Sequence, residues 1–359
     1  MNHAESVPEL SGMGQKTRPY LLWALIALFA LFFFLSLAMG SVRIPVGDVL
    51  AILLGGTPTK ATWATIVFKF RLPKALTAIL AGSALAVSGL QMQTLFRNPL
   101  AGPFVLGISS GASLGVALVV LSVGTAVSGL VASLGLLGNF GVVLAATLGS
   151  SLVLFMVMFA ARRVNTMTLL ILGLLFGYAV SAVVSILLYF AISERIQAYI
   201  NWTFGSFAGV TWGQLQVLMP VILAAIAIGW ASAKPLNALL LGETYARSLG
   251  LTVNRARFWV IMSASLLAGA VTAFCGPIAF IGVAVPHLCR SLFHTSDHRL
   301  LIPAVALMGG IVALFADLVA QLPGSNIVLP LNAVTSLIGT PVVAWVILRR
   351  RNLQASFAS

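Results

Sequence analysis

The run from Tyr20 to Gly40 holds 21 residues without a charged side chain, and similar runs recur through the chain. A transmembrane helix needs about 20 mostly apolar residues, whereas the core of a signal peptide spans only about 7–15. Cleavage after Ala38-Met39-Gly40 is therefore the weaker alternative. Because 60% of the 359 residues are hydrophobic and only 8% are charged, the sequence predicts an all-α protein whose solvent is the lipid bilayer.

Hydrophobicity divides the chain into about ten transmembrane segments. The eighth is too short to span alone, so we expect a half-helix continued by the irregular sequence GPIAFIG (276–282). Other parts of the protein must bury that sequence, because lipid cannot satisfy its backbone. The ten expected segments are 20–41, 65–95, 103–122, 140–161, 168–191, 214–233, 257–276, 284–293, 299–321 and 332–348.

Lysine and arginine are spread unevenly over the two sides of this arrangement. Ten crossings place both termini on one side, which we assign to the cytoplasm because cations concentrate in cytoplasmic loops. The cytoplasmic cations are Lys16, Arg18, Arg97, Arg162, Arg163, Lys234, Arg247, Arg255, Arg257, Arg290, Arg299, Arg349, Arg350 and Arg351. The six on the other side are Arg43, Lys60, Lys69, Arg71, Lys74 and Arg195. The net charge of +13 therefore fits membrane topology and does not indicate nucleic-acid binding.

This topology implies a cytoplasmic tail at residues 1–19, a polytopic transmembrane domain at 20–351 and a second cytoplasmic tail at 352–359. Leu80–Gly89 and Leu267–Gly276 are identical at five of ten positions, at an offset that also pairs Pro99 with Pro286. The first copy runs inward and the second outward, which predicts an inverted repeat of the kind found in transporters. A chance match among small apolar residues remains the alternative.

Few residues could carry chemistry. Gly107-Ile108-Ser109-Ser110-Gly111 fits the nucleophile pattern G-x-S-x-G, but glycines at four-residue spacing favour close helix packing. Asp317 is interpreted as a structural carboxylate and His287 as a hydrogen-bonding residue at a helix start, so a proton relay is disfavoured. Cys275 and Cys289 give neither a disulfide framework nor a metal-binding spacing. No phosphate-binding G-x-x-x-x-G-K-[ST] occurs, so any ATP must be bound by another chain.

Two polar stretches stand out. FKFRLPKAL (68–76) places Lys69, Arg71 and Lys74 on the side where cations should be scarce. Contacts of these long side chains with lipid headgroups are one explanation. GETYARSLG (242–250) lies in the longest cytoplasmic connection and predicts a short helix, with Glu243 at its start and Gly250 at its end. It serves either as a plain connector or as a knob for a cytoplasmic partner.

Five stretches together resemble the permease subunits of type II ABC importers, the FecCD/BtuC-like family that moves ferric siderophores, haem and cobalamin across the bacterial inner membrane. The resemblance covers nearly the whole chain after residue 20. The stretches are Arg71–Gly115, Gly242–Leu251 (GETYARSLGL), Cys275–Arg290 (CGPIAFIGVAVPHLCR), Asp297–Ala304 (DHRLLIPA) and Leu329–Arg351.

The resemblance implies a BtuC-like fold of ten helices and a multi-pass inner-membrane permease. It also implies a homodimer that works with two ATP-binding subunits and a periplasmic binding protein. The chain itself would bind no cofactor and no metal, and ATP and magnesium would sit on the ATPase. Cargo is a metal chelate, with ferric siderophore first and haem and cobalamin next. An ion-coupled secondary transporter is the alternative function, and an intramembrane hydrolase built on Ser109 is a remoter one.

The resemblance also implies roles for particular residues. Arg71 and Lys74 match basic residues that dock the binding protein, and Gln321 replaces an arginine that usually joins them. Asn98 and Leu100 match a cytoplasmic gate, with Thr166 and Thr168 as a second gate element. The positions that match the helix coupling the permease to its ATPase are Gly242, Glu243, Ala246, Leu249 and Gly250.

Overall fold

The computed structural model describes residues 18–121, 139–322 and 327–356, and within these ranges every regular element is helical. Most of the expected N-terminal tail lies outside the described residues. The first five residues of the expected C-terminal tail, 352–356, belong to the last helix. The helices are α2 (Arg18–Ala38), α3 (Val46–Leu53), α4 (Ala61–Ile66), the π-helical turn η1 (Val67–Arg71), α5 (Leu72–Leu95), α6 (Ile108–Val120), α8 (Asn139–Ala160), α9 (Thr166–Phe190), α10 (Ser193–Thr203), α11 (Trp212–Ala231), α12 (Ala233–Leu240), α13 (Glu243–Ser248), α14 (Val253–Cys275), α15 (Ile281–Phe293), α16 (His298–Ala320) and α17 (Leu331–Ser356).

The ten expected segments all appear as apolar helices. Seven helices of the described residues are long and apolar enough to cross a membrane, and three shorter apolar helices bring the number to ten. The three are α6, α15 and the Leu331–Trp345 part of α17. The sequence analysis did not predict α3, α4, α10 or α12, whose short lengths gave no transmembrane signal. The expected all-α membrane fold is confirmed.

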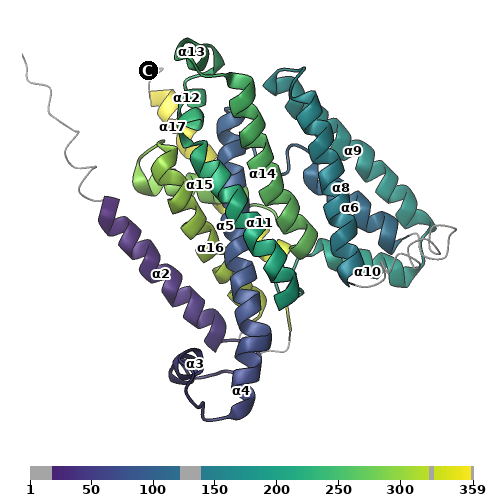
Figure 1. Cartoon of the computed structure of the whole chain (residues 1–359), viewed down its shortest axis with the longest axis vertical. Helices are drawn as coiled ribbons and strands as arrows, with labels where there is room; N and C mark the ends of the chain where they lie inside the picture. Colours follow the sequence, from purple (N-terminus) through teal and green to yellow (C-terminus); the bar gives the residue numbers. More distant parts are fainter. Residues whose placement is uncertain (1–17, 122–138, 323–326, 357–359) are drawn as a thin grey trace, which may run out of the picture.

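Helix α5 runs through the centre of the bundle, where it packs against α11, α14, α15 and α16 (Figure 1). Twenty of its 24 residues are buried. Helix α2 lies against α16 at the outside, and α6, α8, α9 and α10 form a second group beyond α14 (Figure 1). Helices α12 and α13 mark one end of the molecule, called the α13 end below. Helices α3 and α4 with η1 mark the opposite end, called the η1 end.

Small residues let the central helices approach one another closely. A Cβ atom at Gly82 of α5 would collide with the backbone of Gly309 in α16, and one at Gly89 with the backbone of Gly282 in α15. Such contacts are the usual way for membrane helices to pack, because lipid offers no hydrophobic driving force between them. Larger side chains at these positions would push α5 away from the core that it organises.

Both copies of the internal repeat lie in this core. Helices α5 and α14 pack side by side and run in opposite directions, as an inverted repeat requires (Figure 1). Ser88 of the first copy donates a hydrogen bond at 2.8 Å to the carbonyl oxygen of Ala264, which lies in α14 just before the second copy. The irregular stretch 276–280 is largely buried by protein, and the Asn332 side chain accepts a hydrogen bond from the Ala279 N–H at 3.0 Å. The expected half-helix is therefore present as α15.

The G-x-S-x-G sequence packs helices, as the glycine spacing predicts. Gly111 of α6 meets the backbone of Gly149 in α8, and Gly115 meets Ala145. The Ser109 hydroxyl shares a 2.9 Å hydrogen bond with the Thr272 hydroxyl. No histidine among the described residues hydrogen-bonds Ser109, so the base that a serine nucleophile needs is missing there.

The π-helical turn η1 has a cause in the sequence. Pro73 has no N–H, and in an α-helix its ring would clash with the carbonyl group four residues earlier. The wider turn relieves that clash, and the Leu72 N–H reaches back five residues to the Val67 carbonyl. Pro73 would be the corresponding donor for Phe68, whose carbonyl oxygen instead accepts the indole N–H of Trp212 at 2.8 Å. Proline thus fixes η1 at the FKFR sequence and ties it to the start of α11.

Candidate functional sites at the two ends of the bundle

Helix α13 ends in a well-formed cap. The Leu251 N–H donates to the Ala246 carbonyl at 3.0 Å, and the Gly250 N–H donates to the Arg247 carbonyl at 2.9 Å. This bond pair defines a Schellman motif, in which Gly250 takes the left-handed conformation with φ of 82°. The expected short helix with a glycine end is confirmed, and Gly242, with φ of 108°, precedes its first residue.

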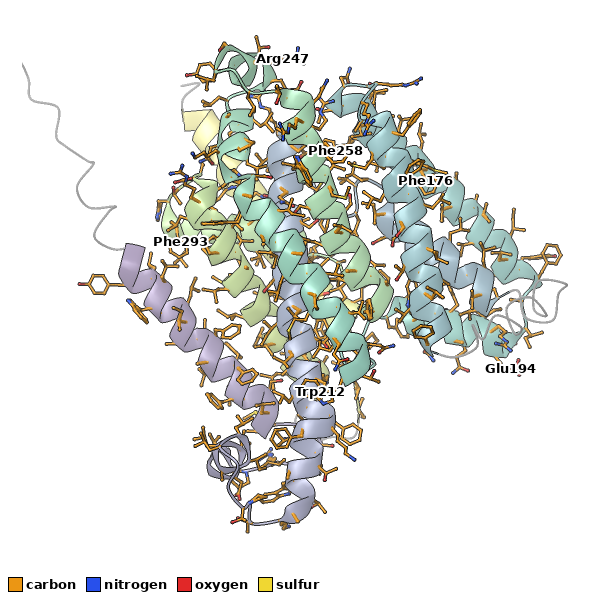
Figure 2. The ribbon with its side chains drawn as sticks, viewed as in Figure 1. Phe176, Glu194, Trp212, Arg247, Phe258 and Phe293 are labelled. Atoms are coloured by element: carbon orange, nitrogen blue, oxygen red, sulfur yellow. The ribbon has the colours of Figure 1, made fainter. Side chains whose placement is uncertain are left out.

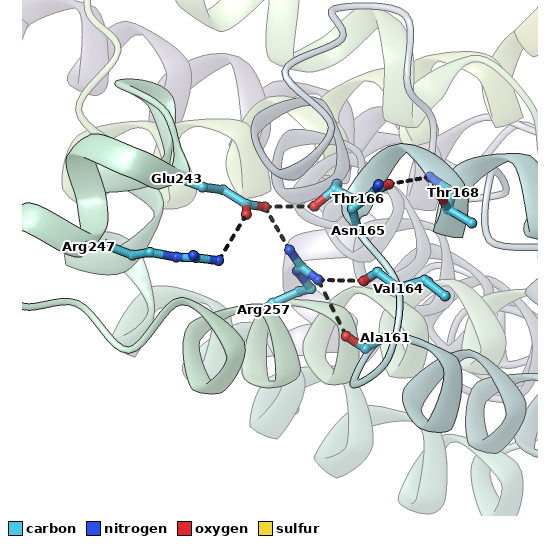
Figure 3. A network of polar contacts seen from close by, with 8 residues as sticks. All are labelled: Ala161, Val164, Asn165, Thr166, Thr168, Glu243, Arg247 and Arg257. Carbon is cyan, nitrogen blue, oxygen red and sulfur yellow. Dashed lines mark hydrogen bonds and ion pairs between the residues drawn. The ribbon is translucent and has the colours of Figure 1, made fainter.

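Glu243 joins three elements at the α13 end (Figure 3). The Thr166 hydroxyl at the start of α9 donates to Glu243 Oε1 at 2.8 Å. The Arg257 guanidinium on α14 donates to the same oxygen at 2.7 Å. Thr166 was expected at a gate and Glu243 in the coupling helix, and the structure places the two side chains in direct contact.

Arg257 is the functional residue that the sequence analysis missed, counting it only as one of fourteen cytoplasmic cations. Its side chain is 5% exposed. Besides Glu243, it donates to the carbonyl oxygens of Ala161 at 3.3 Å and Val164 at 3.0 Å, just past the end of α8. Those carbonyls would otherwise lack partners at the helix end. One guanidinium therefore fixes the α8–α9 loop, α13 and α14 together.

The carboxylate of Glu243 is held in its charged form. Burial acts to raise the pKa of Glu243, but the hydrogen bond from Thr166 and the hydrogen bond and charge of Arg257 outweigh it and hold that pKa below its ordinary value. Arg247 adds an exposed ion pair at 3.8 Å, which contributes little in solvent. The contact is therefore a charged one at neutral pH.

One face of α13 points away from the protein. Ala246 is fully buried against the bundle, whereas Tyr245 and Leu249 are 51% and 61% exposed. Leu241, just before the helix, is also exposed. Figure 2 shows Arg247 at this end, far from Glu194 and Trp212 near the opposite end. The exposed side of α13 is an apolar knob flanked by a cation.

The expected gate residues lie in two separate places. The Asn98 side chain accepts a hydrogen bond from the Leu100 N–H at 2.9 Å, which shapes the loop after α5. His287 of α15 lies 2.7 Å from the Pro99 carbonyl oxygen and braces the same loop. Thr168, in the first turn of α9, donates its N–H to Asn165. In the part of the chain that the structure describes, no hydrogen bond joins Asn98 or Leu100 to either threonine.

The three expected docking residues gather at the η1 end. Lys74 pairs with Asp317 at 2.9 Å, and Gln321 donates to the other oxygen of Asp317 at 2.6 Å. Gly40 lies between Arg71 and Gln321, because a Cβ there would approach both side chains. Asp317 is 3% exposed, which confirms its interpretation as a structural carboxylate held by neighbouring helices.

The Arg71 guanidinium makes its hydrogen bonds to other groups of the protein. Its guanidinium donates to the carbonyl oxygens of Leu37 at 2.7 Å and Ala38 at 2.9 Å, and also to that of Val42. It thus caps the end of α2. Lys69, in contrast, is exposed within η1 beside the exposed rings of Phe68 and Phe70. The sequence analysis noted Lys69 only as part of the cation cluster, yet it is the most accessible cation of the three.

Among the described residues, no three His, Cys, Asp or Glu side chains come together as a ligand set. Glu243 and Arg257 at one end, and Arg71, Lys74 and Asp317 at the other, are engaged with helix ends and with one another. This arrangement suits mechanical connection between helices and binding of partner proteins.

Comparison with known proteins gives a consistent picture. The family model for the FecCD transport family matches residues 28–349. The vitamin B12 import system permease protein BtuC of Klebsiella pneumoniae is 36% identical over 348 residues, covering 97% of this chain and 99% of that protein. The BtuC protein of Salmonella typhi is 37% identical over 316 residues, covering 88% and 90%.

A solved structure is similar as well. It is described as a metal-chelate type ABC transporter in an inward-facing conformation. The two structures superpose with a TM-score of 0.79 at 28% sequence identity, over 92% of this chain and 99% of the other.

Proposed function

The chain belongs to the FecCD transport family as a permease subunit of an ABC importer, and we propose that it forms the translocation path for a metal chelate. The observation that supports this most strongly is the end-to-end likeness to vitamin B12 permeases. The bundle carries apolar helices that are long enough to cross a membrane, as a translocation path requires.

Cobalamin is the first cargo to test, because the permeases reported above are named for vitamin B12 import. Ferric siderophore, which the sequence resemblance favoured on frequency alone, and haem are the other candidates. All three are bulky metal chelates. A path lined by helices can pass any of them, so the binding protein would select the cargo.

We assign the α13 end to the cytoplasm and both termini to the same side. The cation distribution supports this orientation. In the bacterial inner membrane, the exposed face of α13 with Tyr245 and Leu249 would then seat in one of two separate ATPase subunits, which bind ATP and magnesium. Closure of the ATPases would pull on α13, and Glu243 would pass the movement to α9 and α14 through Thr166 and Arg257.

A homodimer would enclose the path between two copies, with Asn98, Leu100, Thr166 and Thr168 at its cytoplasmic gate. The periplasmic binding protein would dock at the η1 end. Arg71, Lys74 and Gln321 would lie beneath the docked protein, and Lys69 would be the exposed cation that meets its acidic residues. Charges at the rim of an interface steer association more than they add affinity.

The decisive experiment is uptake into proteoliposomes that contain the permease with its cognate ATPase, supplied with the cognate binding protein. Cobalamin, a ferric siderophore and haem are offered in parallel, with and without ATP. We expect ATP-dependent uptake of one chelate. Uptake that continues without ATP and collapses with an uncoupler would identify an ion-coupled secondary transporter and overturn the proposal.

A further inference from the structure

A continuous groove follows the seam between α8 and α14 on the outer surface of the bundle. It consists of three hollows of about 770, 460 and 440 Å³. Ser151 and Leu154 line both the first and the second. Met158, Arg162 and Phe258 line both the second and the third. The three hollows therefore form one continuous groove along α8.

The middle of this groove is apolar. Phe155, Phe159 and Met262 form its walls, and Phe258 reaches into it from α14 (Figure 2). Ser151 and Arg162 are eleven residues apart, so this section is about 16 Å long at about 1.5 Å per residue. That length is about half of the 30 Å hydrocarbon thickness of a bilayer. It matches the depth of one leaflet.

Two exposed arginines lie at the end of the groove that is nearest to α13. Arg162, Asn254 and Arg255 line the outermost hollow, and all three are exposed. The Arg162 guanidinium lies over the Phe258 ring at 5.9 Å, which holds it at the groove's edge. No ion pair joins Arg162 or Arg255 to a carboxylate within the described ranges. Their neighbour Arg257 is different, since it is buried against Glu243.

We propose that this groove binds an anionic phospholipid. The phosphate headgroup would lie between Arg162 and Arg255 at the membrane surface. One acyl chain would follow the aromatic wall of α8 toward the wide hollow near Gly269. Basic pockets between transmembrane helices bind acidic headgroups in this way, because the cation offsets the phosphate charge while the seam buries the chain.

The charges favour lipid over a second copy of this chain. Of the carboxylates that the structure describes, Glu243 and Asp317 are ion-paired and Asp297 accepts hydrogen bonds. Asp48 accepts two hydrogen bonds from Thr59, and Glu194 lies away from the α13 end (Figure 2). At the α13 end a second copy would therefore offer only Glu243 and Asp297, and both are already bonded to groups of their own chain. The phosphate of a phospholipid lies at the membrane surface, where Arg162 and Arg255 would meet it.

The test is native mass spectrometry of the delipidated full-length permease, titrated with phosphatidylglycerol and with phosphatidylcholine of the same acyl chains. We expect tighter binding of phosphatidylglycerol. The double variant Arg162→Gln, Arg255→Gln should bind phosphatidylglycerol about tenfold or more weakly, because each basic residue favours an acidic membrane surface. Its affinity for phosphatidylcholine should not change.

Two further variants keep the result clear. Arg299→Gln removes an exposed cation of the same end outside the groove and should leave both affinities unchanged. Ser151→Trp fills the groove and should weaken both lipids alike, provided that its melting temperature matches the parent protein. Equal affinity for the two lipids, or a double variant that retains phosphatidylglycerol, would overturn the proposal. So would loss of dimer in the double variant with lipid binding intact, since the face would then belong to a second copy.

Discussion

Arg71 and Arg257 perform the same structural task at opposite ends of the bundle. Arg71 caps the end of α2 at the η1 end, and Arg257 caps the end of α8 at the α13 end. They differ in what else they hold. Arg257 also binds a carboxylate that belongs to α13. Arg71 has no carboxylate partner in the described part of the chain, because Lys74 pairs with Asp317 beside it.

This difference shows why a cation cluster in a sequence cannot be taken as a free binding surface. At the η1 end, the two cations that a docking motif identifies are already engaged, and the accessible charge is Lys69. At the α13 end, the arginine that no motif identified connects three elements. A partner at the η1 end would therefore meet contacts that are already closed, whereas a partner on α13 would act directly on a shared ion pair.

The largest effect is expected at the buried pair of the η1 end. Lys74→Met leaves the Asp317 carboxylate buried without its cation, which should lower the free energy of unfolding by about 3 kcal/mol. Adding Asp317→Asn should restore most of that loss, because no buried charge then remains. Denaturant unfolding in mild detergent measures both variants. If the double variant is as unstable as the single one, the instability does not come from an unpaired charge on Asp317.

A smaller effect separates the two capping arginines. Arg257→Met should lower the free energy of unfolding by about 2–3 kcal/mol and reduce transport more than tenfold. It removes two hydrogen bonds at the end of α8 and the cationic partner of Glu243. Arg71→Met should lower the free energy of unfolding by only about 1 kcal/mol, because it removes hydrogen bonds but leaves no carboxylate without its cation. Melting temperature and ATP-dependent uptake are measured on both. If the two variants lose the same amount of uptake and the same stability, Arg257 has no role in transport that Arg71 lacks.

The charge of Glu243 can be tested through pH. Its pKa is lower in the folded protein than in the unfolded chain, so its contribution to stability is present above the ordinary glutamate value and is lost as pH falls through the folded pKa. Glu243→Gln should therefore destabilise the protein by about 1 kcal/mol at pH 7. That gap should close below about pH 4. A gap that is constant from pH 7 to pH 3 would show that the carboxylate charge is irrelevant.

The smallest effect on stability is expected at Lys69. Lys69→Glu should change the free energy of unfolding by less than about 0.5 kcal/mol, because the side chain is exposed. It should nevertheless slow association with the binding protein about tenfold at low salt. Arg43→Glu, another exposed cation of the same end, is the matched control. A double reversal of Arg71 and Lys74 is less informative, because it also breaks the contacts of α2 and Asp317.

Most of the fold could be read from the sequence, because a bilayer leaves few options for long apolar segments. The ten segments, the short helix ending at Gly250 and the half-helix α15 follow from composition and from glycine and proline positions. The helices α3, α4, α10 and α12 did not follow from the sequence, since each is too short to give a transmembrane signal.

The sites could be predicted only in part. Motif resemblance identified Glu243 and Thr166 separately, but their contact depends on the fold that brings α9 and α13 together. Arg257 gave no signal, because one arginine near a helix start is common in a cytoplasmic loop. Lys74 and Asp317 lie more than 200 residues apart, and no local pattern connects them. The homodimer, the ATPase contacts and the docking of a binding protein stay predictions.

The sharing of Glu243 by Thr166 and Arg257 has a consequence for protein engineering. Helix α13 looks like a detachable module, since it is six residues long, capped at its end and exposed on its outer face. Its anchoring is distributed over two other segments of the chain, however. A chimaera that receives α13 from another permease would need the matching threonine and arginine from the same donor. With α13 seated in the ATPase as proposed, exchange of ATPase specificity between such permeases would require the transfer of three segments.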